Sequence, residues 1–377
     1  MLKLLCSMVW GQLKMVKEKI IRKSNFELMR IISMFFIIVC HVIDSGNLIN
    51  NCRNSTLIII FEMFMFLTRV HVNSFMLLSG YFQSKSKFKI KKLFKMILQV
   101  WFYLIIFFLI ALKFNLIKEI NAMTILKLFL PSSINDYWFI ASYIITYIFS
   151  DYINIFINRM SRLEHKTFII LGFIILSVLP YLSGLKFLDN TGFNFFHFIY
   201  LYIVGSYLRI YPIKNTYHFK RMKKKDYIVL MLSVFISMFM LNYLMIIFAN
   251  RISGANSIFN YISNNILLTK YCYSNPITII QTIAYFEIFN SLNFKNKIIN
   301  FVSGNVLGIY LFHENIYVRE NIYKILKVDT GIYISYKKIF YFIFAVLIIF
   351  VIGFIIEYIR KKFDSLFTYL FQKFKKL

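Results

Sequence analysis

The chain has 377 residues, of which 59% are hydrophobic and 19% aromatic, and it carries a formal net charge of +28. Soluble domains are about 45–50% apolar, so this composition excludes an ordinary soluble domain and indicates many membrane-spanning segments. The positive charge does not indicate nucleic-acid binding, because Lys and Arg form short clusters between apolar runs, as topology determinants do. The four cysteines have neither CxxC spacing nor a nearby histidine pair, so we predict neither a disulfide framework nor a metal site.

Ten apolar runs predict an all-α, polytopic integral membrane bundle of about ten transmembrane helices. The runs cover residues 26–44, 57–82, 96–113, 137–158, 167–184, 195–211, 226–249, 271–292, 298–318 and 339–359. With the N-terminus in the cytoplasm, the cytoplasmic segments hold 30 Lys and Arg residues and the external segments hold 12, which favours the cytoplasm for both termini. We therefore expect a basic cytoplasmic lead-in (1–24), a transmembrane domain (25–360) and a basic cytoplasmic tail (361–377).

The first apolar run, Asn25–Asp44, holds one arginine near its start and one histidine near its end. Arg30 and His41 are eleven residues apart, so both side chains project from one face of the helix, about 16 Å apart along its axis. Arg30 either marks the helix end, with Glu27 as an ion-pair partner three residues earlier, or contacts the phosphates of a cytoplasmic donor. His41 either bonds a backbone carbonyl or, as a neutral imidazole, acts as a general base on a hydroxyl.

The second run contains three ionisable residues, Glu62, Arg69 and His71. This number exceeds what packing within a membrane needs, so we expect at least one of them to line a polar cavity. The run ends in the phrase SGYF, Ser79 to Phe82, which by itself indicates an exit turn built from small residues.

The later runs add aromatic and small residues that are commonly structural. Tyr137 to Phe139 open the fourth run and are most simply an aromatic belt at the membrane interface. Gly205 in the sixth run, and Gly304 with Gly308 in the ninth, are expected to let neighbouring helices approach closely.

The later runs also contain buried ionisable residues. Glu287 and Glu357 are intramembrane carboxylates that could orient a histidine, and His313 and Glu314 lie near the outer end of the ninth run. His313, or an intramembrane glutamate (Glu62 or Glu287), could orient His41 or relay its proton. The sequence has no Gly-rich phosphate loop, HExxH motif, nucleophile elbow or DxD-like cluster, so a glycosyltransferase gains no support.

Five short motifs, taken in order, resemble those of the membrane-bound acyltransferase-3 family, in particular members linked to O-acetylation of surface and capsular polysaccharides. The family's first helix carries an acidic residue, then an arginine, then ten residues and a histidine, and here Glu27, Arg30 and His41 stand at those spacings. The other four motifs are VNSFMLLSGYF, the Tyr137-Trp138-Phe139 opening, VGSYL and GNVLGIYLFHENIY. The resemblance covers residues 24–360.

The resemblance implies an acyl-CoA donor on the cytoplasmic side, contacted near Arg30, and a catalytic His41. Our hypothesis is an O-acyltransferase of the bacterial plasma membrane that moves an acyl group, most simply acetyl, from acyl-CoA to a hydroxyl of a cell-surface or capsular polysaccharide or its lipid-linked precursor. Arg30, together with Arg69, would anchor the donor's anionic groups, because a guanidinium fork suits phosphate better than an ammonium does. Glu27 and His313 would assist His41. Acetyl-CoA is a substrate here, and we expect no permanently bound cofactor.

The chain departs from the family pattern in two respects. Members with a double-arginine motif near the second helix are matched here by Arg69 alone. No soluble esterase-type domain follows the membrane part, so we expect transfer to depend on the helix bundle itself.

Two other functional classes stay open from the sequence. A polysaccharide flippase or polymerase would be expected to have a large external loop or many arginines in its cavity. The arginines placed inside the membrane here are Arg30 and Arg69, since Arg209, at the end of the sixth run, is counted with the cytoplasmic segment. A proton-coupled transporter would use the same buried charges, although no internal repeat is visible. The sequence also leaves open succinyl transfer, peptidoglycan or small lipids as acceptors, and the oligomeric state.

Overall fold

A computed structural model describes residues 22–52, 54–117, 120–121, 137–183, 191–253, 257–326, 328 and 337–374. These residues are almost entirely helical and include no strand, which confirms the predicted all-α class. Most of the predicted lead-in, residues 1–21, lies outside the described residues, as do the last three residues of the predicted tail. The boundaries of the three predicted segments therefore stay predictions.

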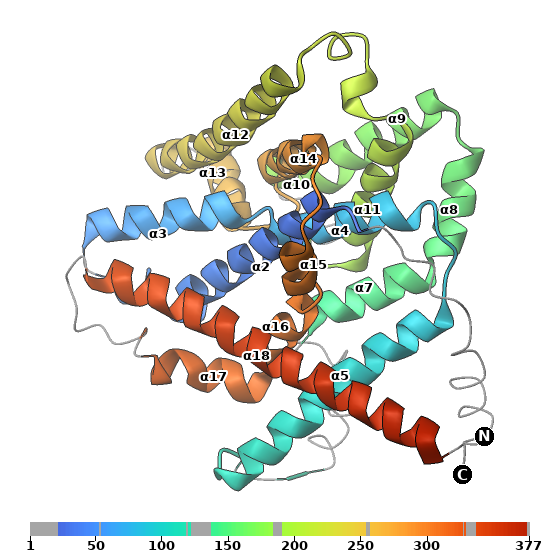
Figure 1. The fold of residues 1–377 in the computed structure, drawn as a ribbon. Helices are drawn as coiled ribbons and strands as arrows, with labels where there is room; N and C mark the ends of the chain where they lie inside the picture. Colours follow the sequence, from blue (N-terminus) through green and yellow to red (C-terminus); the bar gives the residue numbers. More distant parts are fainter. Residues whose placement is uncertain are drawn as a thin grey trace.

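The helices follow one another in chain order through the bundle (Figure 1). They are α2 (Ser24–Asp44), α3 (Ser55–Thr68), α4 (His71–Gln83), α5 (Ile90–Lys113), α7 (Trp138–Ile148), α8 (Ser150–Arg159), α9 (Arg162–Phe173), α10 (Leu179–Ser183), α11 (Phe195–Ile210), α12 (Lys224–Ile252), α13 (Ser257–Thr269), α14 (Pro276–Ser291), α15 (Lys297–Ser303), α16 (Val306–His313), α17 (Ile316–Ile325) and α18 (Lys337–Phe374). A π-helical turn, Ile174–Val178, joins α9 to α10, and a 3₁₀ turn, Ile213–Asn215, precedes α12.

Asparagine side chains begin several of these helices. The side-chain oxygens of Asn54, Asn194, Asn275, Asn296 and Asn315 accept hydrogen bonds from backbone N–H groups in the first turns of α3, α11, α14, α15 and α17. The first N–H groups of a helix have no partner within it, so each cap satisfies donors that would otherwise be costly in an apolar environment.

Six helical stretches of the described residues are long and apolar enough to cross a membrane, and the pair α7–α8, bent by 55°, would make a seventh. The predicted number of about ten is therefore not confirmed. Two of the predicted runs, 195–211 and 271–292, form helices of only 16 residues, α11 and α14. A third, 298–318, is interrupted at Gly304 and Asn305, which separate α15 from α16. The orientation of the termini stays a prediction.

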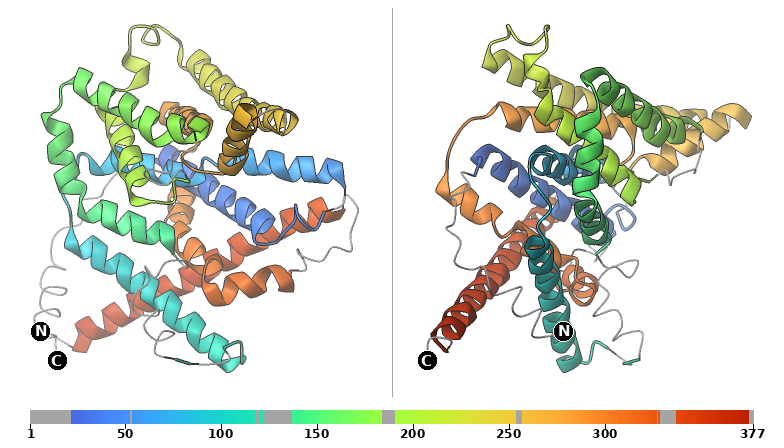
Figure 2. Two further views of the ribbon diagram at one scale, coloured as in Figure 1. Left: turned by 180° about the vertical axis from the view of Figure 1, so that it is seen from behind. Right: turned by 90° about the vertical axis from the view of Figure 1, so that its right-hand side faces the viewer.

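Helix α2 lies at the centre of the bundle and contacts α3, α4, α14, α15, α16 and α18. Figures 1 and 2 show α12 and α13 on one side of α2 and the long α18, with α5 and α17, on the opposite side. Because α2 carries Arg30 and His41, this central position surrounds both side chains with helices from distant parts of the sequence.

The glycines of two motifs lie where helices meet backbone to backbone. A Cβ placed on Gly80 of α4 would overlap the backbone of Tyr202, and one placed on Gly205 of α11 would overlap the backbone of Leu77. The close approach predicted for Gly205 is thus present. The exit turn expected for the SGYF phrase is wrong, because α4 continues to Gln83 and Gly80 serves this helix contact.

Of the predicted pair Gly304 and Gly308, only Gly308 lies at a contact between helices. Gly308 of α16 faces Glu357 of α18, with no room for a Cβ between them, so it does permit close approach. A Cβ on Gly304 would instead meet mainly the carbonyl oxygen of Phe301 at 3.2 Å, within its own turn. Gly304 ends α15 rather than packing against a neighbouring helix.

The aromatic belt expected at Tyr137 to Phe139 is also wrong. Tyr137 is buried, and its hydroxyl donates a 2.6 Å hydrogen bond to the carbonyl of Leu311. The ring of Trp138 stacks on Tyr273 with a centroid distance of 5.7 Å. Tyr137 thus holds α7 against α16 through a hydrogen bond, and Trp138 packs α7 against the residues that precede α14.

We predict that Gly80→Val destabilises the protein by forcing α4 and α11 apart. Overpacking of a close contact typically costs about 1–3 kcal/mol, so the midpoint of thermal unfolding of the detergent-purified protein should fall by several degrees. Gly304→Ala, whose new methyl group meets no neighbouring backbone closer than 3.2 Å, is the matched control. Equal unfolding midpoints for the two variants would contradict the backbone contact.

Candidate active site

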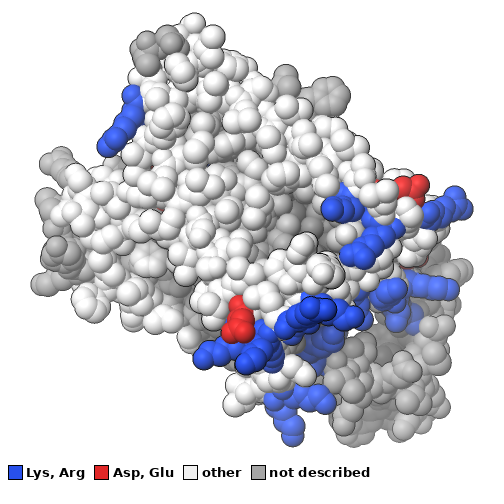
Figure 3. All heavy atoms as spheres, turned by 90° about the horizontal axis from the view of Figure 1, so that it is seen from above, with Lys and Arg blue, Asp and Glu red and all other residues white. Residues whose placement is uncertain are grey.

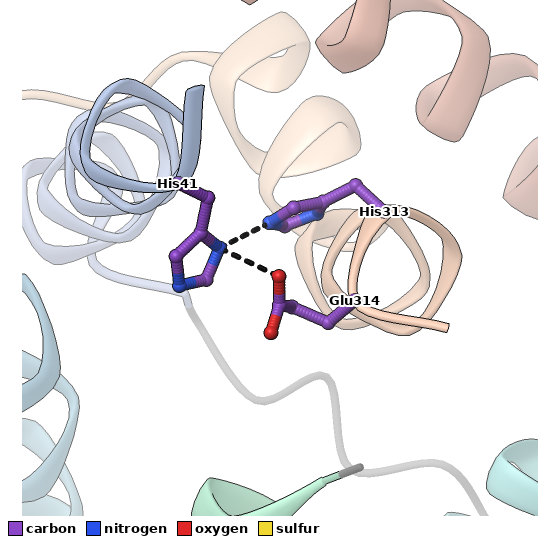
Figure 4. Close-up of side chains that lie close together, drawn as sticks. All are labelled: His41, His313 and Glu314. Atoms are coloured by element: carbon purple, nitrogen blue, oxygen red, sulfur yellow. Dashed lines mark hydrogen bonds and ion pairs between the residues drawn. The ribbon is translucent and has the colours of Figure 1, made fainter. Parts of the chain in front are cut away.

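Three ionisable side chains meet between the end of α2 and the end of α16. His41 Nδ1 lies 3.1 Å from His313 Nε2 in hydrogen-bonding geometry and 2.9 Å from Glu314 Oε1 (Figure 4). His313 is fully buried, and Glu314 is 7% exposed in its side chain, whereas the side chain of His41 is 22% exposed. His41 is therefore the member of this group that an outside molecule can reach.

A backbone carbonyl decides which nitrogens of these histidines carry protons. His313 Nδ1 lies 2.7 Å from the carbonyl oxygen of Ile309, and because a carbonyl can only accept, this nitrogen donates. In a neutral His313, Nε2 must then accept, so the proton between the two rings belongs to His41 Nδ1. His41 Nε2 is left with a free lone pair, and Figure 4 shows it on the side of the ring away from His313 and Glu314.

Glu314 gives this arrangement its charge. Oε1 lies 2.9 Å from His41 Nδ1 and Oε2 lies 3.5 Å from the guanidinium of Arg319 on α17. A carboxylate beside Nδ1 stabilises the imidazolium that forms when Nε2 takes up a proton. The group therefore has the parts of a general base: a nitrogen with a fixed lone pair, a partner that orients the ring, and a negative charge beside it.

The same three side chains could hold a metal ion, since one ligand atom of each lies within 4.8 Å of the others. His41 Nδ1 and His313 Nε2 are already hydrogen-bonded to each other, and His313 Nδ1 is bonded to the carbonyl oxygen of Ile309. We interpret the group as two hydrogen-bonded histidines with a carboxylate at ion-pair distance, and the absence of a metal site stays a prediction.

Arg30 is held at the other end of the same face of α2. Its Nη1 donates a 2.6 Å hydrogen bond to Glu27 Oε1, and the second oxygen of Glu27 accepts a short hydrogen bond from Ser303 Oγ. The guanidinium also lies over the ring of Phe82, 5.6 Å from its centroid. Glu27 is buried, while the side chain of Arg30 is 30% exposed, so the cation remains accessible.

A cavity of about 340 Å³ begins at Arg30 and extends toward the histidines. Lys92, Lys95 and Gln99 of α5 line it together with Arg30. The rest of the lining is mainly apolar and comes from α2, α4, α7 and α16: Met34, Ile37, Phe75, Leu78, Phe139, Ile140, Val306 and Leu307. Its lining extends along α2 as far as Ile37, one turn before His41, which is not itself a lining residue.

Tyr310 lines this cavity one turn before His313. Its ring packs edge-on against the imidazole of His313, with centroids 6.0 Å apart. Tyr310 is 5% exposed, and its hydroxyl has no hydrogen-bond partner among the described residues. A buried hydroxyl without a partner is costly, so the Tyr310 hydroxyl is a candidate donor to a bound molecule.

Comparison with known families shows to which family the chain belongs. The model of the acyltransferase-3 family, whose description is an acyltransferase domain, matches residues 23–358. The chain belongs to this family. Comparisons with curated proteins and with solved structures gave no match. Together with its apolar helices, family membership makes the chain a multi-pass membrane acyltransferase, which favours this class over a flippase or a transporter.

The site residues predicted for this acyltransferase fall into two groups. The structure brings together His41 and His313, and it brings Glu27 to Arg30. Glu27 is fourteen residues before His41, about 21 Å along α2, so it can influence the reaction only through Arg30.

Arg69 lies apart from the Arg30 cavity. Its Nε donates to the carbonyl oxygen of Tyr271, and its guanidinium lies 4.5 Å from the centroid of the Tyr273 ring. The other ionisable residues of the second run are also engaged elsewhere: Glu62 pairs with Lys270 at 3.6 Å, and His71 is fully buried. None of the three is among the residues that line the cavity at Arg30.

The carboxylate beside His41 was not assigned from the sequence. Glu287 accepts a 2.9 Å hydrogen bond from the hydroxyl of Tyr227, and Glu357 accepts two bonds of 2.8 Å from Arg360. Glu314 takes the position instead. The one signal for it in the sequence was that it directly follows His313, where α16 ends.

We predict that Glu314→Gln lowers the kcat of this acyltransferase by about 10²-fold or more while the KM for acyl-CoA stays near the wild-type value. The amide keeps the shape of the carboxylate but removes the charge that stabilises the His41 imidazolium. Steady-state kinetics on protein in lipid nanodiscs would measure both constants. Glu62→Gln, which alters a carboxylate paired with Lys270, should retain wild-type kinetics. Wild-type kcat in Glu314→Gln would remove Glu314 from the mechanism.

Proposed function

We propose that the chain is an O-acyltransferase that moves an acyl group, most simply acetyl, from acyl-CoA to a hydroxyl of a cell-surface or capsular polysaccharide or its lipid-linked precursor. The observation that supports catalysis best is the proton arrangement at His41. Nδ1 donates its proton to His313 and lies beside the Glu314 carboxylate, which leaves Nε2 as a base on a partly exposed ring. The acceptor class, and a place in the bacterial plasma membrane, rest on the motif resemblance.

The proposed reaction uses His41 first as a base and then as an acid. Nε2 takes the proton of the acceptor hydroxyl while the hydroxyl oxygen bonds to the thioester carbonyl carbon, and the carbonyl electron pair moves to its oxygen. When that pair returns, the carbon–sulfur bond breaks, and the departing thiolate takes the proton from Nε2. General base action typically contributes about 10²–10⁴-fold, so positioning of the two substrates must contribute much of the rest.

The donor is proposed to enter the cavity at the end lined by Arg30. Three cations, Arg30, Lys92 and Lys95, gather there, and the diphosphate of CoA needs such partners. Beyond them the apolar lining suits the pantetheine arm, whose thioester would lie toward Tyr310 and His41. Glu27 is proposed as a positioning residue, since it holds Arg30 through a 2.6 Å hydrogen bond. The position of Arg69 argues against a donor contact, and we propose Lys92 and Lys95 in its place.

We predict that His41→Ala abolishes acylation of the surface glycan while the amount of protein in the membrane stays normal. The alanine removes the only proposed base but leaves the helix intact. Mass spectrometry of glycans from a deletion strain carrying each variant would measure the acyl content. His218→Ala, which changes an exposed histidine, should restore acylation as the wild type does. Retained acylation in His41→Ala would refute the mechanism.

We also predict a role for Tyr310 in holding the thioester carbonyl oxygen. Tyr310 lines the cavity one turn before His313, and its buried hydroxyl has no hydrogen-bond partner among the described residues. Removing one donor to a developing oxyanion typically costs on the order of 10²-fold in kcat. Tyr310→Phe should therefore lower kcat by about that factor with little change in KM for acetyl-CoA.

Tyr323→Phe is the matched control for this prediction. The hydroxyl of Tyr323 is likewise buried and without a partner among the described residues, but it does not line the cavity. Equal kcat for the two phenylalanine variants would show that the Tyr310 hydroxyl does not contact the reacting group.

A further inference from the structure

A second hollow, of about 390 Å³, opens beside the cavity that holds Arg30. It lies between the α15–α16 junction and the C-terminal part of α18. Three cations line it, Arg22, Lys361 and Lys362, together with the partly exposed ring of Tyr358. Figure 3 shows the molecule from above, and most of the Lys and Arg side chains visible in that view gather on one side.

The carboxylates near the hollow do not cancel its charge. Glu357 is fully buried and receives two 2.8 Å hydrogen bonds from Arg360, and Asp364 receives a 2.6 Å bond from the same guanidinium. Glu357 lies 3.6 Å from the ammonium of Lys361, so one carboxylate is shared by two cations. Within the part of the chain that the structure describes, two carboxylates therefore face four cations around the hollow, and the balance is positive.

Two of the cations also have a structural role. Arg22 donates a 3.0 Å hydrogen bond to the carbonyl oxygen of Asn300, and Lys361 donates a short one to the carbonyl of Gly304. Positive charges at the C-terminus of α15 are favourable in themselves. Lys362 makes no such bond in the described residues: its ammonium lies over the ring of Tyr358, 5.5 Å from the centroid. Stabilisation of the α15 C-terminus therefore does not account for the position of Lys362 at the hollow.

The hollow and the Arg30 cavity meet at Gly304, which lines both. The Arg22 guanidinium lies 3.5 Å from the position of a Cβ on Gly304, on the side of the hollow. On the side of the cavity, Ser303 bonds Glu27, which holds Arg30. A molecule bound at Arg30 would thus lie beside a hollow lined by a second set of cations, with Gly304 between the two.

We propose that this hollow binds a phosphate ester through Lys362 and Arg22. Such a phosphate ester could come from two sources. One is the 3′-phosphate of the CoA donor, and this source rests on the function proposed above. The other is the headgroup of an anionic lipid, and this source is independent of that function. Tyr358 adds an aromatic face beside the cations, which suits an adenine ring or the start of an acyl chain.

The test compares CoA with 3′-dephospho-CoA on the full-length protein in phosphatidylcholine nanodiscs. The wild type should bind CoA about tenfold more tightly, and Lys362→Gln and Arg22→Gln should bring the two dissociation constants together. Lys295→Gln, which changes an exposed lysine outside both cavities, should keep the preference. Thermal unfolding would confirm that each variant is folded.

A second arm of the experiment detects the lipid. Native mass spectrometry would measure retention of phosphatidylglycerol by the wild type and by Lys362→Gln. Equal affinity for the two nucleotides, with phosphatidylglycerol retention that Lys362→Gln reduces severalfold, supports the hollow as a lipid phosphate site. Equal affinity with unchanged retention overturns the proposal. If the wild type binds neither nucleotide, the proposed acyl-CoA donor is wrong, and the lipid arm alone decides the role of the hollow.

Discussion

The candidate site depends on one hydrogen bond, from His313 Nδ1 to the carbonyl oxygen of Ile309. It is a contact within a single helical turn, yet it fixes the tautomer of His313 and, through it, that of His41. A histidine that could exchange tautomers would present a lone pair to a substrate only part of the time. Because His313 is fully buried, no water competes for either of its nitrogens in this arrangement.

Close helix packing fixes the position of α16, which contacts both α2 and α18. Gly308 lets α16 lie directly against Glu357 of α18, and Gly353 of α18 lies against Ile309 in return. Tyr137 braces α16 from the other side through the carbonyl of Leu311. The motif that runs from Gly304 to Tyr317 therefore combines two roles, since its small residues set the position of the helix and its polar end supplies His313 and Glu314.

One face of α2 connects the cavity to the candidate catalytic group. Arg30, Met34 and Ile37 line the cavity along one face, and His41 follows on the same face. The axial distance between Arg30 and His41 is about 16 Å. The acyl-CoA donor proposed above would therefore have to lie extended along α2, with its phosphates at Arg30 and its thioester toward His41.

The sequence by itself determined the helical class, the shared face of Arg30 and His41 and the family, and it offered the pairing of Glu27 with Arg30 as one of two alternatives. These depend on local periodicity and on spacing within one helix, which a sequence states directly. Tertiary structure decided the rest: that Glu314 and not Glu287 or Glu357 sits beside His41, that Lys92 and Lys95 join Arg30, and that Arg69 does not. His41 and His313 are 272 residues apart, and no local pattern fixes which side chains a folded bundle brings into contact over such a separation.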